Sequence, residues 1–322
     1  MDSTDLALAN EIFDRIDALA QISEHDQHLT RRSLTEEHKR ANTLVGTWMQ
    51  KAGMTTRTDA VGNIIGRLEG SSDQSAALLM GSHLDTVRNA GRYDGMLGVV
   101  LPLLCLERLQ SRGETLPYPV EVVGFCDEEG VRFPSTLIGS RAIAGSLEAS
   151  VLEESDSDNI TVAKALSDFG ASGTLANAAR RRQDFLGFIE CHIEQGPVLE
   201  RKDLSVGVVT AISGASRFTI TVTGKAGHAG TVPMGLRKDA LCAACECILK
   251  IESLCTKEPN LVGTVGQLKC LPGAGNVIPG NVEFSLDLRS SIDSHREIAT
   301  VRINEALATC LLYTSPSPRD RG

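Results

Sequence analysis

The chain has 322 residues, which is enough for two domains of ordinary size. Its 41 acidic residues outnumber its 32 basic residues and give a formal charge of −9, which excludes a non-specific nucleic-acid binder with a basic surface. Hydrophobic residues make up 42% and aromatic residues 4% of the chain, a composition that favours a packed, glycine-rich α/β protein over a disordered chain or an aromatic-cored β-sandwich.

Two amphipathic helices are predicted at the start of the chain. The apolar stripe of the first contains Ile12, Ile16 and Leu19. The second is predicted to begin at a capping box formed by Ser33 and Glu36 and to end at Gly53. Its apolar stripe contains Ala41, Leu44, Val45, Trp48 and Met49.

Short apolar runs follow, and most are continuous rather than alternating, as is typical of strands buried on both faces. These runs are residues 61–68, 76–80, 120–126 and 186–193. A helical pattern at 95–108 lies between two of them and indicates alternation of strand and helix. Residues 1–211 are therefore expected to form an α/β domain with a mostly parallel or mixed sheet.

The pattern changes near residue 212. Residues 216–225 alternate with period two, as an antiparallel strand with one solvated face would. A helix near 236–254, two strands near 261–271 and 282–289, and a helix from about Ser294 complete a β-α-β-β-α order. This order predicts a ferredoxin-like α+β domain at 212–311. Residues 312–322 do not continue it and are expected to be a non-native tail.

Targeting and redox signals are sparse. The first residues are acidic and lack an apolar stretch, and the longest apolar run, 96–106, is too short to span a membrane. Nine cysteines in such a chain favour reduced thiols, so we expect a cytoplasmic protein without membrane association. Cys242, Cys245 and Cys247 could form a zinc site, but Cys247 is off the helix face of the other two, which favours small buried thiols.

Ionisable residues gather where predicted strands end. The segments that contain them are GSHLDTV (81–87), YDG (93–95), CDEEG (126–130) and ECHIEQG (190–196). Each alone has a simpler interpretation as a turn or a solvated loop end. Because functional groups in open α/β sheets collect at the carboxyl ends of strands, their coincidence favours a common site.

Imidazoles combined with carboxylates suit Zn²⁺ or Mn²⁺, and a bridging carboxylate lets two ions lie about 3.5–4 Å apart. Of the adjacent Glu128 and Glu129, one could bind metal while the other acts as a general base toward water. Asp85, two residues after His83, is expected to hydrogen-bond the imidazole and fix its tautomer. The residues therefore predict a hydrolytic metal site.

Six segments in order resemble the dinuclear-metal amidohydrolases of the M20 peptidase clan. They are GSHLDTV, RYDGMLGV, DEEGVRFPSTLIGSRAIAG, ECHIEQGPVLE, GKAGHAGTVPM and GNVIPG followed by DLRS. The resemblance runs from about residue 5 to about residue 310. It is strongest to the branch of allantoate amidohydrolases, N-carbamoyl-L-amino-acid hydrolases and β-ureidopropionases, for which His192 is the marker.

This resemblance implies a metallopeptidase-like catalytic domain with a mixed sheet and an inserted ferredoxin-like lid, through which the chain would form a homodimer. It also implies two divalent metal ions. The implied roles are a first metal bound by His83 and His192, a bridge at Asp94, a second metal bound by Glu129, a catalytic base at Glu128, and support of His83 by Asp85.

In the family the second metal also takes a histidine from a later segment that returns to the catalytic domain. No histidine of this sequence lies in a matching context, so the C-terminal part of the catalytic domain is expected to be missing. A catalytic zinc generally has three protein ligands. We therefore expect the chain as given to hold its second metal weakly and to turn over poorly.

The substrate side of the resemblance lies mainly in the second domain. Arg289 would bind a substrate carboxylate through its guanidinium, although an ion pair with Asp287 is the simpler interpretation. Asn276 would contact substrate, although its Gly-rich surroundings also suit a plain turn. His228 would stabilise the oxyanion and contact substrate, and Gln195 would contact the ureido or carboxylate end.

The implied activity is hydrolysis of the carbamoyl (ureido) C–N bond of a small anionic substrate. Allantoate is the first expectation, which would place the chain in purine catabolism, and an N-carbamoyl-L-amino acid or β-ureidopropionate is the second. A dipeptidase or deacylase, a non-catalytic dimerising relative and an artefact of sequence assembly are the remaining alternatives. An intact Glu128 speaks against the non-catalytic relative, which would not need a base.

Overall fold

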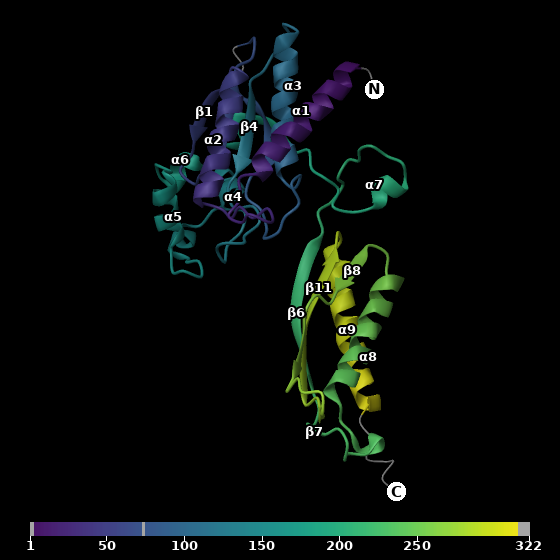
Figure 1. Ribbon diagram of the computed structural model, residues 1–322. Helices are drawn as coiled ribbons and strands as arrows, with labels where there is room; N and C mark the ends of the chain where they lie inside the picture. Colours follow the sequence, from purple (N-terminus) through teal and green to yellow (C-terminus); the bar gives the residue numbers. More distant parts are fainter. Residues whose placement is uncertain (1–2, 73–74, 315–322) are drawn as a thin grey trace. The chain divides into compact units, whose positions relative to one another are not determined.

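The computed structural model describes residues 3–72 and 75–314. The chain divides into two compact units between Arg201 and Lys202 (Figure 1). The boundary expected at residue 212 lies in the irregular stretch before the first strand of the second unit, which starts at Gly214. Each unit is described by itself.

The first unit is built on a five-stranded mixed sheet, as predicted. Its strands are β1 (Thr55–Thr58), β2 (Ile64–Leu68), β3 (Ala77–His83), β4 (Val120–Phe125) and β5 (Phe185–Ile189), in the spatial order β1-β2-β4-β3-β5. β3 runs parallel to β4 and β5, whereas β1 and β2 are antiparallel to their neighbours. Every residue of β4 is buried, as its continuous apolar run predicts.

The prediction of burial on both faces is wrong for β5. Leu186, Phe188 and Ile189 are 42%, 49% and 47% exposed. β5 lies at the edge of the sheet, where β3 is its only partner among the described strands. An apolar run alone does not distinguish a central strand from an edge strand.

Three long helices cover this sheet: α1 (Ser3–Ala20), α2 (Glu36–Lys51) and α3 (Met96–Ser111). α1 packs on α3, α3 packs on β3, and α2 packs on β1 and β2 (Figure 1). The predicted stripes are correct, since Ile16, Leu19, Val45 and Met49 are fully buried in one core. This core supports the sheet from which the candidate site residues extend.

The capping box predicted for the second helix is wrong. The N-cap is Thr35, whose side chain accepts a hydrogen bond from the main-chain N–H of His38. The hydroxyl of Ser33 donates instead to the buried carboxyl group of Asp127. Gly53 follows the helix with φ +69°, a conformation that favours glycine and agrees with the predicted stop.

Short helices with their own small core follow β4. They are α4 (Ile138–Ile143), α5 (Val162–Phe169) and α6 (Leu175–Ala178), with a 3₁₀ turn at Ala149–Glu153. A 3₁₀ turn at Arg182–Asp184 precedes β5, and α7 (Val198–Arg201), which has no buried residue, follows β5. Val162, Leu166 and Phe169 of α5 pack in this core beside Cys126, the residue after β4. The loop after β4 is thereby packed against a second group of helices.

The second unit has the predicted order of strands and helices. It contains β6 (Gly214–Thr223), β7 (Gly227–His228), a 3₁₀ turn at Met234–Leu236, α8 (Ala240–Lys257), β8 (Leu261–Thr264), β9 (Leu268–Leu271), β10 (Val277–Ile278), β11 (Asn281–Ser290) and α9 (Asp293–Thr314). β11 pairs antiparallel with β6 along its whole length. β8 and β9 pair with successive halves of β11, so the strand predicted at 261–271 is one strand interrupted in the middle.

α8 and α9 pack together against one face of this sheet. Along β11 the buried residues Val282, Phe284, Leu286 and Leu288 alternate with more exposed ones, so the opposite face is polar. β7 and β10 form a separate two-stranded ribbon. The helix α9 continues to Thr314, and residues 315–322 of the expected tail lie outside the described residues.

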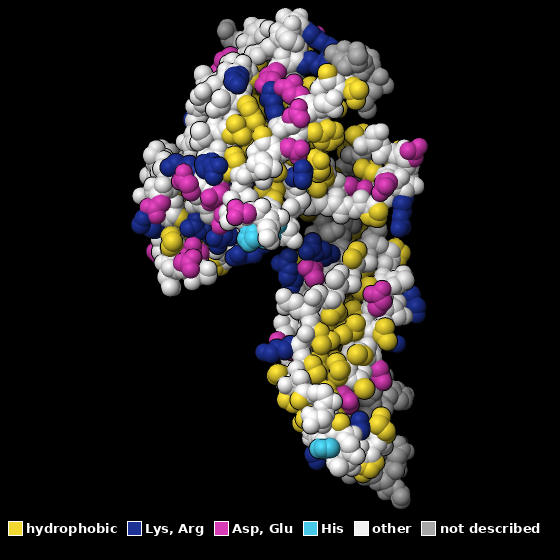
Figure 2. Space-filling model, viewed as in Figure 1, with side chains coloured by type: hydrophobic (Ala, Val, Ile, Leu, Met, Phe, Trp, Pro, Cys, Tyr) yellow, Lys and Arg dark blue, Asp and Glu magenta, His cyan; other side chains and the backbone are white. Residues whose placement is uncertain are grey.

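Three further observations bear on the sequence predictions. None of the helices in the described residues is long and apolar enough to cross a bilayer. Figure 2 shows Lys and Arg side chains interspersed with Asp and Glu side chains on the visible face of the first unit. Of the 242–247 cluster only Cys247 is buried, so the prediction of buried thiols is wrong for Cys242 and Cys245.

Candidate metal centre

The parallel strands of the first unit bring the candidate residues to one edge of its sheet. In the registers His83↔Phe125 and Met80↔Ile189, β3, β4 and β5 end on the same side. The segment 83–86 leaves the end of β3, the segment 126–130 follows β4, and the segment 190–196 follows β5. The structure therefore brings the segments after these strands to one edge of the sheet, as the sequence predicts, and their role as a common functional site stays a prediction.

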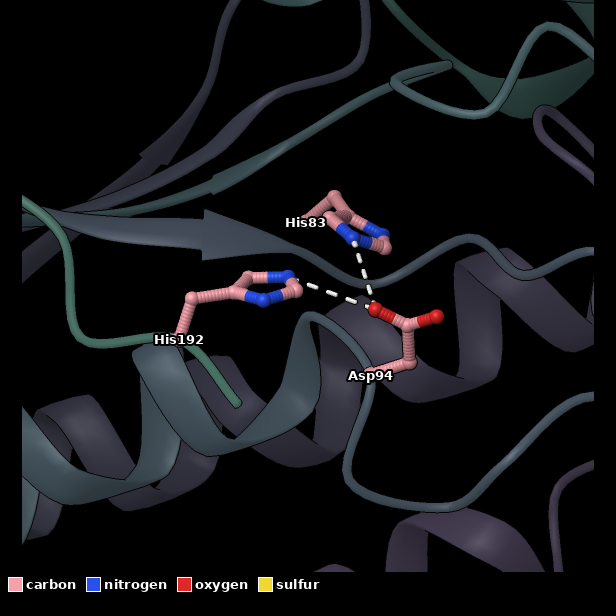
Figure 3. A group of neighbouring side chains, drawn as sticks. All are labelled: His83, Asp94 and His192. Carbon is pink, nitrogen blue, oxygen red and sulfur yellow. Dashed lines mark ion pairs between the residues drawn. The ribbon is translucent and has the colours of Figure 1, made fainter. Parts of the chain in front are cut away.

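Two histidines face one carboxylate oxygen at this edge. Nε2 of His192 lies 3.3 Å and Nε2 of His83 lies 3.9 Å from Oδ1 of Asp94 (Figure 3). The three ligand atoms lie within 4.8 Å of one another. The side chain of His83 is 4% exposed and that of His192 is 30% exposed, so the group opens toward solvent on the side of His192.

Main-chain carbonyl groups fix the tautomers of both rings. Nδ1 of His83 lies 2.8 Å from the carbonyl oxygen of Asp85, and Nδ1 of His192 lies 3.0 Å from that of Ile193. A carbonyl oxygen can only accept, so each Nδ1 carries the proton and donates it. In the neutral ring each Nε2 therefore presents a lone pair toward Asp94, which is the form of histidine that binds a metal ion.

The predicted contact between Asp85 and His83 is made by a different atom. The main-chain carbonyl of Asp85, not its side chain, accepts the hydrogen bond from the imidazole. The buried carboxylate of Asp85 instead accepts the main-chain N–H groups of Glu128 and Glu129, each at 3.2 Å. Asp85 therefore connects the end of β3 to the loop after β4.

A second group of possible ligands shares His83. It consists of His83, Glu128 and Glu129, again with ligand atoms within 4.8 Å of one another. Oε2 of Glu128 lies 3.8 Å from Nε2 of His83, and the Glu128 side chain is 42% exposed. Glu128 and Glu129, of which one is predicted to bind metal and the other to act as a base, thus both lie beside His83.

The pKa values show an excess of carboxylates at this edge. Burial, and then neighbouring carboxylates, raise the pKa of Glu128 and of Glu129, whereas the charge of His83 opposes the rise. Burial lowers the pKa of His83, but the carboxylates and the hydrogen bond to Asp85 outweigh it and leave this pKa raised.

A divalent cation fits this donor set. Among the described residues, no Lys or Arg forms an ion pair with Asp94, Glu128 or Glu129. Two imidazole lone pairs together with carboxylate oxygens match the ligands preferred by zinc and manganese ions. The side chains thus supply both the ligand atoms and the uncompensated negative charge that such an ion requires.

Gly95 permits the close approach of Asp94 and His83. Its φ of +76° favours glycine, and a Cβ atom there would lie 2.5 Å from ring atoms of His83. The sequence Asp94-Gly95 has the simple interpretation of a turn. The structure shows that this turn is also the space into which the imidazole fits.

Gln195 and Glu190 lie at the same edge. Nε2 of Gln195 donates to Oδ2 of Asp94 at 2.8 Å. Gln195 is expected to contact substrate, but in this structure it hydrogen-bonds the carboxylate that is expected to bridge the two metals. Glu190, to which the sequence assigned no role, accepts a hydrogen bond from Ser82, and its charge contributes to the raised pKa of Glu128. The sequence could have indicated Glu190 as a site residue, because it belongs to the ionisable segment that follows β5.

The second unit brings two of its three predicted residues together. His228 pairs with Val277 between β7 and β10, and the N–H of Ala229 donates to the carbonyl of Asn276 at 3.0 Å. Nδ1 of His228 accepts the N–H of Gly230 at 3.0 Å. The neutral ring therefore carries its proton on Nε2, the opposite of His83 and His192, and can donate there.

Arg289 lies apart from them, on the polar face of the sheet. Its Nε and Nη2 atoms donate to the two carboxylate oxygens of Asp287 at 2.9 and 3.0 Å, so the predicted ion pair is present. Nε of Arg217 donates to the same carboxylate at 3.3 Å. The Arg289 side chain remains 51% exposed, and it lines a shallow hollow with Thr219 and Thr264. Its Nη1 atom is left for a further acceptor.

Comparisons with known proteins agree with this geometry. Residues 79–312 match the profile of peptidase family M20/M25/M40. The chain is 45% identical over 262 residues to an N-carbamoyl-L-amino acid amidohydrolase of Geobacillus stearothermophilus, covering 81% of this chain and 64% of that protein. It is 42% identical over 315 residues to an allantoate deiminase of Arabidopsis thaliana, covering 90% of this chain and 60% of that protein.

A solved structure has the same fold. A hydantoinase/carbamoylase family amidase from Burkholderia ambifaria superposes with a TM-score of 0.85 at 33% identity, over 95% of this chain and 74% of that one. The chain thus spans less than two thirds of the two curated relatives and about three quarters of this structure.

Proposed function

Since this chain belongs to peptidase family M20/M25/M40, we propose that it hydrolyses the carbamoyl (ureido) C–N bond of a small carboxylate, with allantoate as the first substrate. The observation that carries this proposal is the convergence of two imidazole lone pairs and the Asp94 carboxylate beside paired glutamates. One water molecule is consumed, and ammonia, CO₂ and the amine are released.

His83, Asp94 and His192 would hold one divalent ion. Glu129, which lies in the second group with His83 and Glu128, would help to hold a second ion, and Asp94 would contribute to it as the resemblance implies. When bound, such ions supply Lewis-acid polarisation of a carbonyl group and lower the pKa of water. We propose Zn²⁺ or Mn²⁺, because the donor set combines imidazole nitrogen with carboxylate oxygen. Gln195 would keep Asp94 oriented through the hydrogen bond to its Oδ2 atom.

Glu128 is the proposed general base. It is part-exposed, so it can reach a water molecule in the solvent-facing part of the site. Burial and the charges of neighbouring carboxylates raise its pKa, which makes its carboxylate a better proton acceptor. Asp85 holds the main chain of Glu128 in place from behind. Glu128 would take the proton of the attacking water and return it to the leaving amine.

The second unit would provide the substrate contacts. Nε2–H of His228 is proposed to donate to the oxyanion that develops on the scissile carbonyl, in agreement with the tautomer set by Gly230. Arg289, held in plane by Asp287, is proposed to bind the substrate carboxylate. Asn276 is proposed as a further contact because its main chain adjoins Ala229, the residue after His228.

A second substrate class is an N-carbamoyl-L-amino acid, as the name of the relative from Geobacillus stearothermophilus suggests. A homodimer formed through the second unit, a cytoplasmic location and a place in purine catabolism belong to the same proposal. The homodimer and the place in purine catabolism rest on the sequence resemblance described above, and the location rests on the reduced thiols that the sequence favours.

Ammonia release tests the proposal. Protein loaded with Mn²⁺ or Zn²⁺ is incubated separately with allantoate, with an N-carbamoyl-L-amino acid and with a dipeptide. Release from either ureido compound, and its loss after removal of the metal with a chelator, is the expected result. Cleavage of the dipeptide alone, or no release from any compound, would contradict it.

A further inference from the structure

The core of the first unit contains a guanidinium group that has no carboxylate hydrogen-bond partner in the part of the chain that the structure describes. Arg31 is fully buried. Its Nη1 atom donates to the carbonyl groups of Leu19 and Ile22, each at 2.7 Å, and its Nε atom donates to that of Leu84 at 2.8 Å. Its Nη2 atom lies 2.8 Å from the sulfur of Met96. Four segments of the chain therefore meet at one side chain.

The surroundings explain how the charge is tolerated. Burying a charge is costly unless polar groups face it. Leu19 is in the last turn of α1, so its carbonyl belongs to the negative end of the helix dipole, and Ile22 lies two residues beyond the helix. Burial lowers the pKa of Arg31 to about 10 while the charge of Asp85 raises it, so the group remains a cation at neutral pH.

Arg31 binds the chain on both sides of Asp85. Leu84 precedes Asp85, and its carbonyl accepts from Nε. Thr86 follows Asp85, and its Oγ1 atom accepts the main-chain N–H of Arg31 at 2.9 Å while its own N–H donates to the Arg31 carbonyl at 2.9 Å. Arg31 thus fixes the turn at residues 84–86. This turn accepts the Nδ1 proton of His83 and holds the Glu128–Glu129 loop.

The same side chain reaches the third ligand segment. Met96 is the first residue of α3 and lies two positions after Asp94. Its sulfur is in contact with Nη2 of Arg31. Lysine could not replace this arrangement, because its single nitrogen cannot direct donors from a planar fork toward separate acceptors.

We propose that Arg31 is a positioning residue of the metal centre, and that its contacts with Leu84, Thr86 and Met96 set the positions of His83, Asp85 and Asp94. This proposal rests on the proposed function, because it assumes that these residues hold a metal ion. It predicts that loss of the guanidinium weakens metal binding beyond any general loss of stability.

Zinc affinity of the full chain is the first test, measured by competition with a chromophoric chelator. Arg31→Met and Arg31→Lys are each expected to bind Zn²⁺ about 10–100-fold more weakly than the wild type. Met49→Ala is the control, since Met49 is fully buried in the same core but lies on α2, which supplies neither a proposed ligand nor a hydrogen-bond partner of Arg31. Affinities of the Arg31 variants within about threefold of the wild type, or an equal loss in Met49→Ala, would overturn the proposal.

A milder variant and a metal-free measurement complete the test. Thr86→Val keeps the shape of the side chain but removes the acceptor for the Arg31 N–H, so this variant is expected to bind zinc more weakly than the wild type. It provides the test if the Arg31 variants do not fold. Imidazole ¹⁵N spectra of metal-free protein should show the Nδ1–H tautomer of His83 in the wild type and its loss in Arg31→Met or, failing that, Thr86→Val.

The two measurements separate this proposal from the proposed function. A wild type that binds no zinc, together with variants that disturb the His83 tautomer, would refute the metal site and leave the positioning role. Zinc binding by a wild type whose variants change neither affinity nor tautomer would refute the positioning role alone.

Discussion

Nε2 of His192 faces Oδ1 of Asp94 at 3.3 Å, and its Nδ1 atom is held by the carbonyl of Ile193. His192 follows β5 and Asp94 precedes α3, so the contact joins segments far apart in the sequence. Because a backbone carbonyl fixes the proton on Nδ1, the nitrogen that faces the carboxylate is the one with the lone pair. The ring is oriented as a ligand before any metal ion binds.

The three site histidines are expected to differ in tautomer. Long-range ¹H–¹⁵N spectra at pH 8 should show Nδ1–H for His83 and His192 and Nε2–H for His228, because the first two donate to carbonyls and the third accepts an N–H. Added Zn²⁺ should shift the Nε2 signals of His83 and His192. A shift at His228 alone would contradict the assignment of ligands.

Glu128→Gln is expected to lower kcat by about 10²–10⁴-fold, the usual contribution of a general base. The amide is nearly the same size but cannot accept a proton at neutral pH. Metal content, measured by mass spectrometry after dialysis, should remain that of the wild type.

Glu129→Gln is the matched variant for this comparison, because the two glutamates are adjacent and both main-chain N–H groups are held by Asp85. It should lose metal affinity rather than kcat at saturating metal. The reverse pattern would exchange the proposed roles of the two residues.

Arg289→Met is expected to raise KM for a carboxylate substrate by about 10–100-fold, since a hydrogen bond between charged groups contributes about 1.5–3 kcal/mol. Steady-state kinetics with the substrate and with its neutral carboxamide analogue separate binding of the carboxylate from other effects. Arg217→Met is the control, because Arg217 shares the carboxylate of Asp287 but makes one longer contact with it. Equal changes in KM for both analogues would exclude a role in carboxylate recognition.

Acid is expected to destabilise the first unit through His38. Its side chain is fully buried, its Nδ1 atom accepts the N–H of Leu34, and its Nε2 atom has no hydrogen-bond partner among the described residues. Burial, and then the charges of Arg31 and His83, lower its pKa from 6.5 to about 3. The folded value is below the unfolded value, so this contribution to stability is complete above pH 6.5 and is lost as the pH falls toward 3.

The expected loss approaches about 1.4 kcal/mol per pH unit below pH 6.5, because only the unfolded state takes up the proton. Urea unfolding followed by circular dichroism at pH 7, 6 and 5 measures it. His38→Gln keeps an acceptor for the Leu34 N–H but does not titrate, so its stability should fall less steeply. Parallel pH profiles for the two proteins would show that His38 is not the titrating group.

Much of the candidate site could be predicted from the sequence because it follows from strand order. His83 and Glu128 come within three residues of the ends of two apolar runs, His192 lies near the end of a third, and parallel strands deliver such residues to one edge. Asp94 could be predicted because an Asp-Gly pair opens an apolar helix. Short sequence patterns are thus enough to predict which residue types could bind a metal and where they lie in the chain.

The supporting contacts could not be predicted, because they depend on atoms rather than on residue types. The sequence places Asp85 beside His83 but does not indicate that its main-chain carbonyl accepts the imidazole proton. Ser33 suits a capping position, yet its hydroxyl is used by Asp127, and Thr35 caps the helix instead. Arg31 belongs to no motif, and its contacts come from segments distant in the chain.

Anomalous X-ray scattering at the zinc edge, from crystals grown with Zn²⁺, tests the central claim most directly. We predict a peak about 2.0–2.2 Å from Nε2 of His83, Nε2 of His192 and a carboxylate oxygen of Asp94. The peak should disappear in crystals of His192→Ala grown in the same way. A wild-type map with no peak between these three side chains, or with zinc bound only elsewhere, would contradict the account.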